Sequence, residues 1–286
     1  MAEPLVSVAL ISYDQEKFIG QALNSILMQE FDGAMEVVVA DDCSTDRTAG
    51  IIERWAEKCP RPVRILPGKE NMGMHRNWER AITACKGKYV ALLEGDDLWT
   101  DPEKLLKQVN VLEQDPNASA CFSNANVLME DGALSDHPYV DRDTENLSAE
   151  DLLSLNFNPI PTCSTVFRRS MFEGFPAEYH DSPFADWILH SILIQNGKYL
   201  CLSETTSTYR QHDRGVWSGI DKEEKLLNKL KTLSIIKMVS NRSYHADIDL
   251  AASKQLDELL YFYREEKYYL KFFRTWLKLK SLQNRS

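Results

Sequence analysis

Four short apolar runs, each followed by an amphipathic segment, fill the first 115 residues and constrain the fold more than any other feature. The runs are LVSVALI at 5–11, EVVVA at 36–40, VRIL at 63–66 and KYVALLE at 88–94. Apolar residues then recur at helical spacing over 15–30, from about Asp46, over 74–85 and over 101–114. This alternation indicates an α/β fold with a mostly parallel sheet covered by helices on both faces. Ligands of such sheets bind beyond the carboxyl ends of the strands.

The alternation weakens after residue 115. The pattern predicts a strand over 118–128, a polar loop over 130–146, a helix near 148–155 and a turn at 158–161. Another helix is expected to begin at Ser182-Pro183, with Ser182 as N-cap, and to stop at Asn196-Gly197. Helices over about 221–240 and 246–280 follow. We therefore expect one catalytic unit over 1–220 and a helical extension over 221–286.

Composition narrows the class of protein. The formal net charge of -10 and the 43% of hydrophobic residues are typical of a globular protein and exclude disordered or collagen-like chains. A net acidic surface repels a polyphosphate backbone, so nucleic acid is not an expected partner. The six cysteines lack CxxC or zinc-site spacing and should be reduced. No window approaches the roughly 20 apolar residues of a membrane span, so a cytoplasmic location is expected.

Three acidic groups stand at predicted element ends. They are Asp41-Asp42, the segment Glu94-Gly95-Asp96-Asp97, and Asp186. Adjacent carboxylates at a strand end repel each other and lose hydration, so a cation or hydrogen-bond donors must compensate. Oxygen ligands favour Mg²⁺ or Mn²⁺, whose shell substrate phosphate and water normally complete. Each pair taken alone also fits a turn or a helix N-cap.

The ordered segments VSVALISYDQEKFIGQALNSILMQ, EVVVADDCSTDRT, NMGMHRNWERAI and GKYVALLEGDDLWTDPEKLLKQ resemble the family 2 glycosyltransferases, which have the GT-A fold. The resemblance is close over about 5–115 and looser through ADW at 185–187 and YRQHDRGVWS at 209–218. It implies transfer of a sugar from a nucleotide diphosphate donor to a hydroxyl, with inversion and usually with Mn²⁺ or Mg²⁺. It assigns 1–115 to the nucleotide sugar and 116–220 to the acceptor.

The resemblance also implies which residues hold the nucleotide. The strand end Ile11-Ser12-Tyr13 would hold base and ribose, with Tyr13 stacked on the base and Asp41 hydrogen-bonded to it. Asn71 and Arg76 match a segment that closes over the nucleotide. Tyr13 also fits an ordinary half-buried aromatic, and Arg76 a solvated charge on a helix.

The segment Glu94-Gly95-Asp96-Asp97 matches the family's metal motif, Asp-any-Asp, except that Glu94 stands first. Asp96 or Asp97 is therefore the expected metal carboxylate, and Asp96 would also contact the donor. A metal that bridges the phosphates stabilises the departing nucleotide.

His212 resembles a histidine that ligates the metal or contacts the diphosphate, and Arg210 or Arg214 could serve the phosphates instead. Processive synthases of the superfamily carry QxxRW. Here Gln211, Arg214 and Trp217 are spaced QxxRxxW, which favours transfer of a single sugar.

Asp186 matches the family's catalytic base, which takes the proton of the acceptor hydroxyl as its oxygen attacks. An already charged nucleotide leaving group needs no second carboxyl as general acid. The alternative is an acid favoured by the dipole at a helix N-terminus. The neighbouring Trp187 could support a sugar or simply pack.

The segment 261–286 differs chemically from the rest of the chain. It has seven basic and two acidic residues, whereas residues 1–260 carry about -15. Its interleaved aromatic and basic residues fit peripheral contact with the inner face of a membrane or an acidic partner, and equally a packed helix with a basic outer face.

The expected partners are a nucleotide-diphospho-sugar, most simply a UDP-sugar, and a glycan, lipid-linked or protein acceptor in the assembly of a bacterial-type surface glycan. The alternative is a non-catalytic protein that binds a nucleotide sugar as a scaffold, because the fold alone does not determine function. A sugar-phosphate nucleotidyltransferase needs a glycine-rich loop after the first strand, which SYDQEKFIG lacks.

Overall fold

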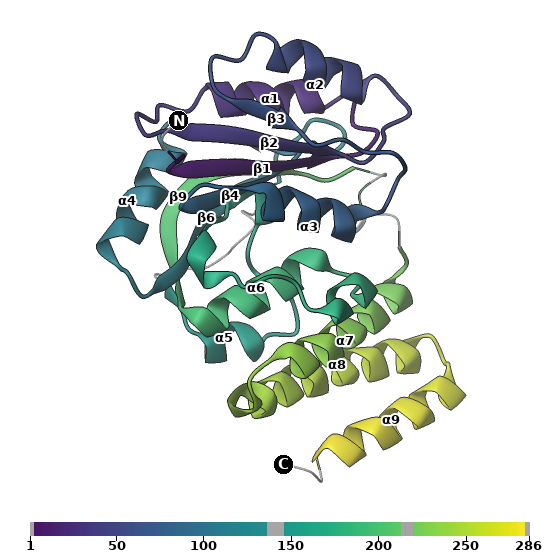
Figure 1. Ribbon diagram of the computed structural model, residues 1–286. Helices are drawn as coiled ribbons and strands as arrows, with labels where there is room; N and C mark the ends of the chain where they lie inside the picture. Colours follow the sequence, from purple (N-terminus) through teal and green to yellow (C-terminus); the bar gives the residue numbers. More distant parts are fainter. Residues whose placement is uncertain (1–2, 136–145, 213–214, 216–219, 284–286) are drawn as a thin grey trace. The chain divides into compact units, whose positions relative to one another are not determined.

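The computed structural model describes residues 3–135, 146–212, 215 and 220–283 (Figure 1). The chain forms two compact units, which are described separately. The first unit comprises Met1–Leu147, Pro159–Phe175 and Asn196–His212, and the second comprises Ser148–Asn158, Pro176–Gln195 and Asp213–Ser286. Residues 148–158 and 176–195 thus group with the C-terminal helices, across the boundary at residue 220 that the sequence suggested for domains. The domain assignment itself stays a prediction.

The first unit carries the sheet. Its strands are β1 (Val6–Ser12), β2 (Met35–Asp41), β3 (Val63–Ile65), β4 (Tyr89–Glu94), β5 (Leu98–Trp99), β6 (Ala118–Leu128), β7 (Asn146–Leu147), β8 (Val166–Arg168) and β9 (Lys198–Arg210). Its helices are α1 (Ile19–Leu27), α2 (Thr48–Ala56), α3 (Met74–Ala84) and α4 (Lys104–Gln114). In Figure 1, α1 and α2 lie on one side of the strands β1 to β3 and α3 lies on the other. The predicted α/β class, a sheet flanked by helices, is confirmed.

Among the described residues, the strands form one sheet in the order β3-β2-β1-β4-β8-β6-β9-β5, with β7 paired to β9. β1 is parallel to both β2 and β4, and β2 is parallel to β3. β8 runs antiparallel between β4 and β6, so the second half of the sheet is mixed. The parallel half brings the ends of β1, β2 and β4 to one edge.

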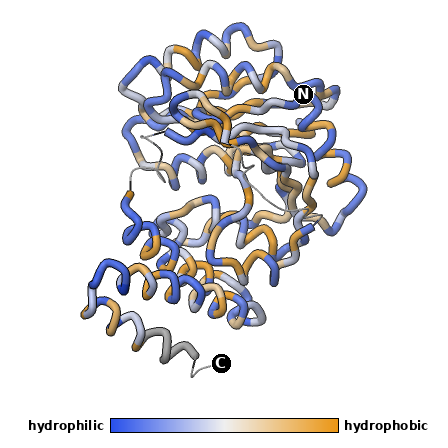
Figure 2. Tube along the Cα trace, turned by 180° about the vertical axis from the view of Figure 1, so that it is seen from behind, coloured by the Kyte–Doolittle hydropathy of each residue, from blue (hydrophilic) through white to orange (hydrophobic). Residues whose placement is uncertain are grey.

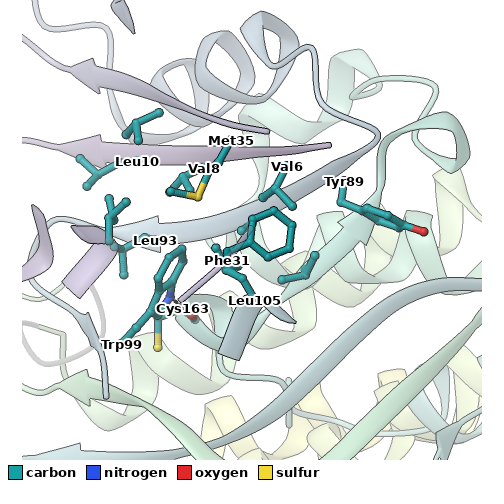
Figure 3. Close-up of a cluster of buried hydrophobic side chains, with 14 of the residues drawn as sticks. Val6, Val8, Leu10, Phe31, Met35, Tyr89, Leu93, Trp99, Leu105 and Cys163 are labelled. Carbon is teal, nitrogen blue, oxygen red and sulfur yellow. Dashed lines mark hydrogen bonds between the residues drawn. The ribbon is translucent and has the colours of Figure 1, made fainter. Parts of the chain in front are cut away.

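Burial explains why β1, β2 and β4 form where the apolar runs predicted. Every residue of β1 is buried, since helices cover both faces of the sheet. Val6, Val8 and Leu10 point into one core, which also contains Leu93 and Trp99 (Figure 3). The strand expected over 118–128 is confirmed as β6.

The sequence pattern did not predict β5, β8 or β9. β9 reads KYLCLSETTSTYR and is half polar: residues 203–205 are exposed, whereas the polar residues 206–208 are buried. β5 and β8 have only two and three residues. Strands this short and this polar carry no periodic signal, so pairing with neighbours decides their formation.

The second unit is helical. It contains α5 (Ala149–Leu153), α6 (Ala185–Asn196), α7 (Lys222–Val239), α8 (His245–Glu265) and α9 (Tyr269–Gln283). Asp221 caps α7, because its side chain accepts a hydrogen bond from the Glu224 N–H at 2.8 Å. α7 and α8 pack through Leu226, Leu259 and Tyr263. No helix of the described residues is long and apolar enough to cross a membrane.

Two helix predictions in this unit were wrong at their ends. α6 begins at Ala185 rather than at Pro183, because the Ser182 hydroxyl holds a turn by accepting the Phe184 N–H at 3.2 Å. The single helix expected over 246–280 is broken between α8 and α9. Lys267 adopts a left-handed φ of 58°, and the Tyr268 N–H bonds back to the Tyr263 carbonyl at 2.8 Å. A glycine normally marks such a stop, and none is present here.

An unusual residue of the first unit is Lys104, whose ammonium group is fully buried. Its Nζ donates to Gln108 Oε1 at 2.7 Å and lies 4.5 Å from the Trp99 ring centre. Burial lowers the pKa of Lys104 to about 7. In the unfolded chain the same group titrates near its ordinary value of about 10.4, so folding favours the neutral amine.

We expect Lys104→Met to change the pH dependence of stability. Below pH 7 the fold must bury a charge, so the variant gains most over wild type there. Between about pH 7 and 10 the unfolded wild type binds more protons than the folded form, so wild-type stability rises and the difference shrinks. Urea unfolding of both proteins at several pH values measures the difference in their free energy of unfolding. A difference in free energy of unfolding that stays constant from pH 6 to 10 would contradict a buried, titrating Lys104.

Candidate active site at the carboxyl edge of the sheet

The parallel register places the ends of three strands together. Ser12 of β1 stands opposite Asp41 of β2, and Ile11 opposite Glu94 of β4. Neighbouring strands lie about 4.8 Å apart, so the backbones of β2 and β4 are about 10 Å apart across β1. The two acidic segments predicted at strand ends therefore flank one strand end.

Asp41 is held by hydroxyl and amide donors. Its Oδ1 accepts from Ser12 Oγ at 2.9 Å and from Ser44 Oγ at 2.5 Å, and its Oδ2 accepts from the Ser44 N–H at 2.9 Å. Ile11 is buried, whereas Tyr13 is 46% exposed. Ser12, Tyr13 and Asp41 thus lie at the ends of two adjacent strands.

The second acid of this pair, Asp42, fastens a loop. It is buried and accepts the N–H groups of Met72 at 2.9 Å and Gly73 at 2.8 Å. Gly73 needs its φ of 86°, a left-handed value that favours glycine. Asn71 is exposed beside it, and Arg76 is exposed in the first turn of α3. Asp42 therefore positions the segment that carries both predicted nucleotide contacts.

Sequence reasoning missed Arg80 of α3, which supports the end of β2. Its guanidinium donates to the Asp41 carbonyl, to the Pro67 carbonyl at 3.0 Å and to Asn77 Oδ1 at 2.7 Å. Asn77 in turn donates to the Ala40 carbonyl at 2.8 Å. The only sequence signal was an Asn and an Arg three residues apart on one helix face.

The turn after β4 separates the two aspartates of the expected metal motif. Asp97 is 3% exposed and accepts the Arg210 N–H at 2.8 Å. Burial, and next the charge of Asp96, raise the pKa of Asp97 well above its usual range. Asp97 is thus turned into the protein and tied to the end of β9.

Asp96 instead faces His212. Its Oδ2 lies 3.0 Å from His212 Nε2, and the side chains are 19% and 8% exposed. The His212 ring packs on Phe18, with ring centres 5.0 Å apart. One carboxylate and one imidazole fit a divalent cation whose other positions go to phosphate and water. Within residues 3–135, 146–212, 215 and 220–283, no group of three or more His, Cys, Asp or Glu is placed to hold a metal.

Arg210 lies beside this pair. Its guanidinium stands 4.5 Å from the Phe18 ring centre and donates to Gln21 Oε1 at 2.8 Å. Burial lowers the pKa of Arg210. A buried cation next to Asp96 and Asp97 offsets part of their charge. The alternative phosphate contact Arg214 and the Trp217 of the QxxRxxW spacing lie outside the described residues.

Asp186 belongs to the second unit. It stands in the first turn of α6, and its Oδ2 accepts from Asn158 Nδ2 at 2.8 Å. The adjacent Trp187 is buried, so it packs rather than presenting a platform for a sugar. Asn158, from the turn predicted at 158–161, was not foreseen as a partner of Asp186.

The sequence of the chain matches the family described as Glycosyl transferase family 2 over residues 7–175. This span exceeds half of the chain. The protein therefore belongs to glycosyl transferase family 2, and the sheet and flanking helices described above are its GT-A fold.

Relatives support this membership. An uncharacterised protein of Mycobacterium tuberculosis is 39% identical over 214 residues, which cover 74% of this chain and 60% of that protein. The chain thus spans about three fifths of this relative's length. A putative teichuronic acid biosynthesis glycosyltransferase, TuaG of Bacillus subtilis, is 31% identical over 57% of this chain and 62% of its own.

Two solved structures share the fold. S. aureus TarS residues 1–349, in complex with UDP-GlcNAc, matches with a TM-score of 0.70 at 18% identity and covers 97% of this chain and 81% of that one. The mannosyltransferase PcManGT of Pyrobaculum calidifontis, in complex with GDP-Man and Mn²⁺, matches with a TM-score of 0.65 at 16% identity and covers 99% and 85%.

Close backbone packing at this edge predicts a stability effect. A Cβ on Gly95 would lie 2.4 Å from Gln15 Oε1, 2.9 Å from Ile19 Cδ1 and 3.1 Å from Ser12 Cβ. We expect Gly95→Ala to destabilise by about 1–3 kcal/mol, because the Gln15 and Ile19 side chains must move away from their packed positions. Gly20→Ala in α1 is the matched control, since a Cβ there meets nothing within 4 Å and should stabilise by about 0.5–1 kcal/mol. Equal denaturant midpoints for the two variants would refute the packing argument.

Proposed function

We propose that this chain is an inverting, metal-dependent glycosyltransferase that moves one sugar from a nucleotide-diphospho-sugar to an acceptor hydroxyl. The observation that carries the proposal is the pairing of Asp96 with His212 at 3.0 Å, next to the strand end where Ser12 holds Asp41. The Asp96–His212 pair offers a place for a cation and phosphates. The strand end with Ser12 and Asp41 offers hydrogen-bond acceptors for a base and its ribose.

The nucleoside would lie along the ends of β1 and β2. Tyr13 would stack on the base, while Ile11, Ser12 and Asp41 would hold base and ribose. Asp41 already accepts three hydrogen bonds that fix its orientation, so it is prepared to accept another from a base N–H. Asn71 and Arg76 would close over the nucleotide from the loop that Asp42 fastens.

The diphosphate would lie at the turn after β4. We assign Asp96 and His212, rather than the inward-turned Asp97, to a Mn²⁺ or Mg²⁺ ion. Imidazole is a poor ligand for Mg²⁺, so Mn²⁺ is the better match to this pair. Such an ion, when bound, supplies Lewis-acid stabilisation of the departing diphosphate. Buried Arg210 would support the same charge from the protein side.

The proposed chemistry is a single displacement. The acceptor oxygen attacks the anomeric carbon and forms the new glycosidic bond while the bond from that carbon to the diphosphate oxygen breaks. Asp186 takes the proton of the acceptor hydroxyl as the oxygen attacks. Asn158 donates to Asp186 Oδ2 at 2.8 Å and so orients this carboxylate at the start of α6. Residues 1–115 would thus bind the donor, and residues 116–220 the acceptor.

Donor and acceptor are proposed by class. UDP-GlcNAc in TarS and GDP-Man in PcManGT support a nucleotide sugar, and we favour a UDP-sugar. The name of TuaG supports assembly of a surface glycan, with a glycan, lipid-linked or protein acceptor. We place this activity in the cytoplasm. The second candidate, a nucleotide-sugar-binding scaffold, requires the same donor site but no base.

Donor hydrolysis tests enzyme against scaffold. The full chain is incubated with UDP-GlcNAc, UDP-glucose or GDP-mannose and Mn²⁺, and release of the nucleoside diphosphate is followed. We expect slow hydrolysis of one donor, its loss in EDTA and its return with Mn²⁺. His212→Ala and Asp96→Asn should each lower the rate by at least about tenfold with nearly unchanged melting temperature.

Glu103→Gln, an exposed carboxylate change near the start of α4, is the control for a general charge effect. Full activity in chelator with metal-free protein would overturn the metal assignment. Donor binding by calorimetry without turnover of any donor would favour the scaffold.

Asp186→Asn separates binding from chemistry. The variant keeps the shape of the side chain but cannot accept the proton, so kcat should fall by roughly 10²–10⁴-fold while affinity for the nucleotide stays unchanged. A role limited to the helix dipole predicts at most about 1 kcal/mol of lost stability and near-normal turnover. Asp257→Asn on α8, an exposed carboxylate of the same unit, should change neither value. If the folded Asp186→Asn variant keeps more than about a tenth of wild-type kcat, Asp186 is not the catalytic base.

A further inference from the structure

Helix α9 has an inner face that packs on the second unit. Phe272 packs against the cluster of Leu256 and Leu260, and Thr275 is buried. Lys271 pairs with Glu223 of α7 at 2.7 Å, which fixes the helix further. The inner face therefore needs no other partner to hold α9 in place.

The outer face of α9 is apolar and exposed. It consists of Tyr269, Leu270, Phe273, Trp276 and Leu277, which are 70%, 82%, 57%, 39% and 49% exposed. Their positions i, i+1, i+4, i+7 and i+8 lie on one side of a helix. Figure 2 shows the described part of α9 carrying hydrophobic and hydrophilic residues side by side. An exposed row of large apolar side chains is characteristic of an interaction surface.

Charge identifies the kind of partner. From Lys267 to the end, the sequence has six basic residues and no acidic one, in a chain whose net charge is -10. Lys267 and Arg274 are exposed beside the outer face. Large aromatic and aliphatic residues flanked by Lys and Arg are typical of helices that lie in the interface of an anionic bilayer.

A second copy of the chain fits less well. Pairing of two outer faces would bring together two segments that each carry seven basic and two acidic residues, and this like-charge contact is unfavourable. An anionic lipid surface instead attracts the basic flank while its headgroup region accepts Tyr, Trp and Leu.

We propose that the outer face of α9 docks this protein on the surface of an anionic membrane, with the helix parallel to the bilayer plane. Leu270 and Phe273 enter the region between headgroups and acyl chains, and Lys267 and Arg274 contact lipid phosphates. The docking is independent of the donor site, so it stands or falls separately from the glycosyltransferase activity.

Vesicle flotation of the full chain tests the proposal. Vesicles of phosphatidylcholine are compared with vesicles in which a third of the lipid is phosphatidylglycerol. We expect at least about tenfold stronger partitioning to the anionic vesicles, and weaker binding at high salt because the charges are exposed. Leu270→Ser with Phe273→Ser should reduce partitioning by about tenfold or more. Lys267→Glu with Arg274→Glu should do the same and flatten the salt dependence.

Matched controls use exposed residues elsewhere. Met238→Ser with Leu250→Ser removes two comparably exposed apolar side chains of α7 and α8. Arg54→Glu in α2 with Lys58→Glu just after it makes the same charge change. Both should leave partitioning within about twofold of wild type. Melting temperatures establish that every variant is folded.

Three outcomes would overturn the proposal. One is partitioning that is equal on neutral and anionic vesicles, another is partitioning unaffected by the Leu270 and Phe273 changes, and the third is no partitioning by the wild type. Light scattering without lipid measures whether the protein forms a dimer. A dimer that dissociates in the Leu270→Ser, Phe273→Ser variant, together with absent lipid binding, would assign the face to a second copy.

Discussion

The parallel pairing of β1 with both β2 and β4 is the constraint on which the candidate site depends. Parallel strands end at the same edge, so Ser12, Asp41 and Glu94 are brought together by register although they lie up to 82 positions apart in the chain. A register shift of one residue would turn each side chain to the other face of the sheet. The fully buried β1 fixes this register, because its alternate residues must fill the cores on both faces.

In each acidic pair at this edge, one carboxylate holds the backbone and the other is partly exposed at the edge of the sheet. Asp42 and Asp97 are buried and accept backbone N–H groups from a loop or from β9, whereas Asp41 and Asp96 stay partly exposed at the edge. The buried member sets where the backbone turns. The partly exposed member then lies on a backbone whose course is already set, which is the arrangement expected of a preorganised site.

The sequence predicted most of the parallel half and only part of the site. Continuous apolar runs located β1, β2 and β4, and the carboxyl-end rule led to the acidic segments Asp41-Asp42 and Glu94-Gly95-Asp96-Asp97. It could not distinguish Asp96 from Asp97, because adjacent residues on a turn differ only in how tertiary packing treats them. Arg80, β9 and the break at Lys267 were missed for a related reason, since long-range hydrogen bonds and local φ decide them and periodicity records neither.

The core beneath the turn explains how a buried Asp97 is tolerated. Trp99 Nε1 donates to the Cys163 carbonyl at 2.7 Å, and the Cys163 thiol lies against the Asp97 carboxyl. Burial raises the pKa values of both Asp97 and Cys163, which favours their neutral, protonated forms. A neutral Asp97 can share hydrogen bonds with the thiol and the Arg210 N–H without an isolated buried charge. The turn then presents the Asp96 carboxylate to whatever binds beside His212, while Asp97 stays turned into the protein.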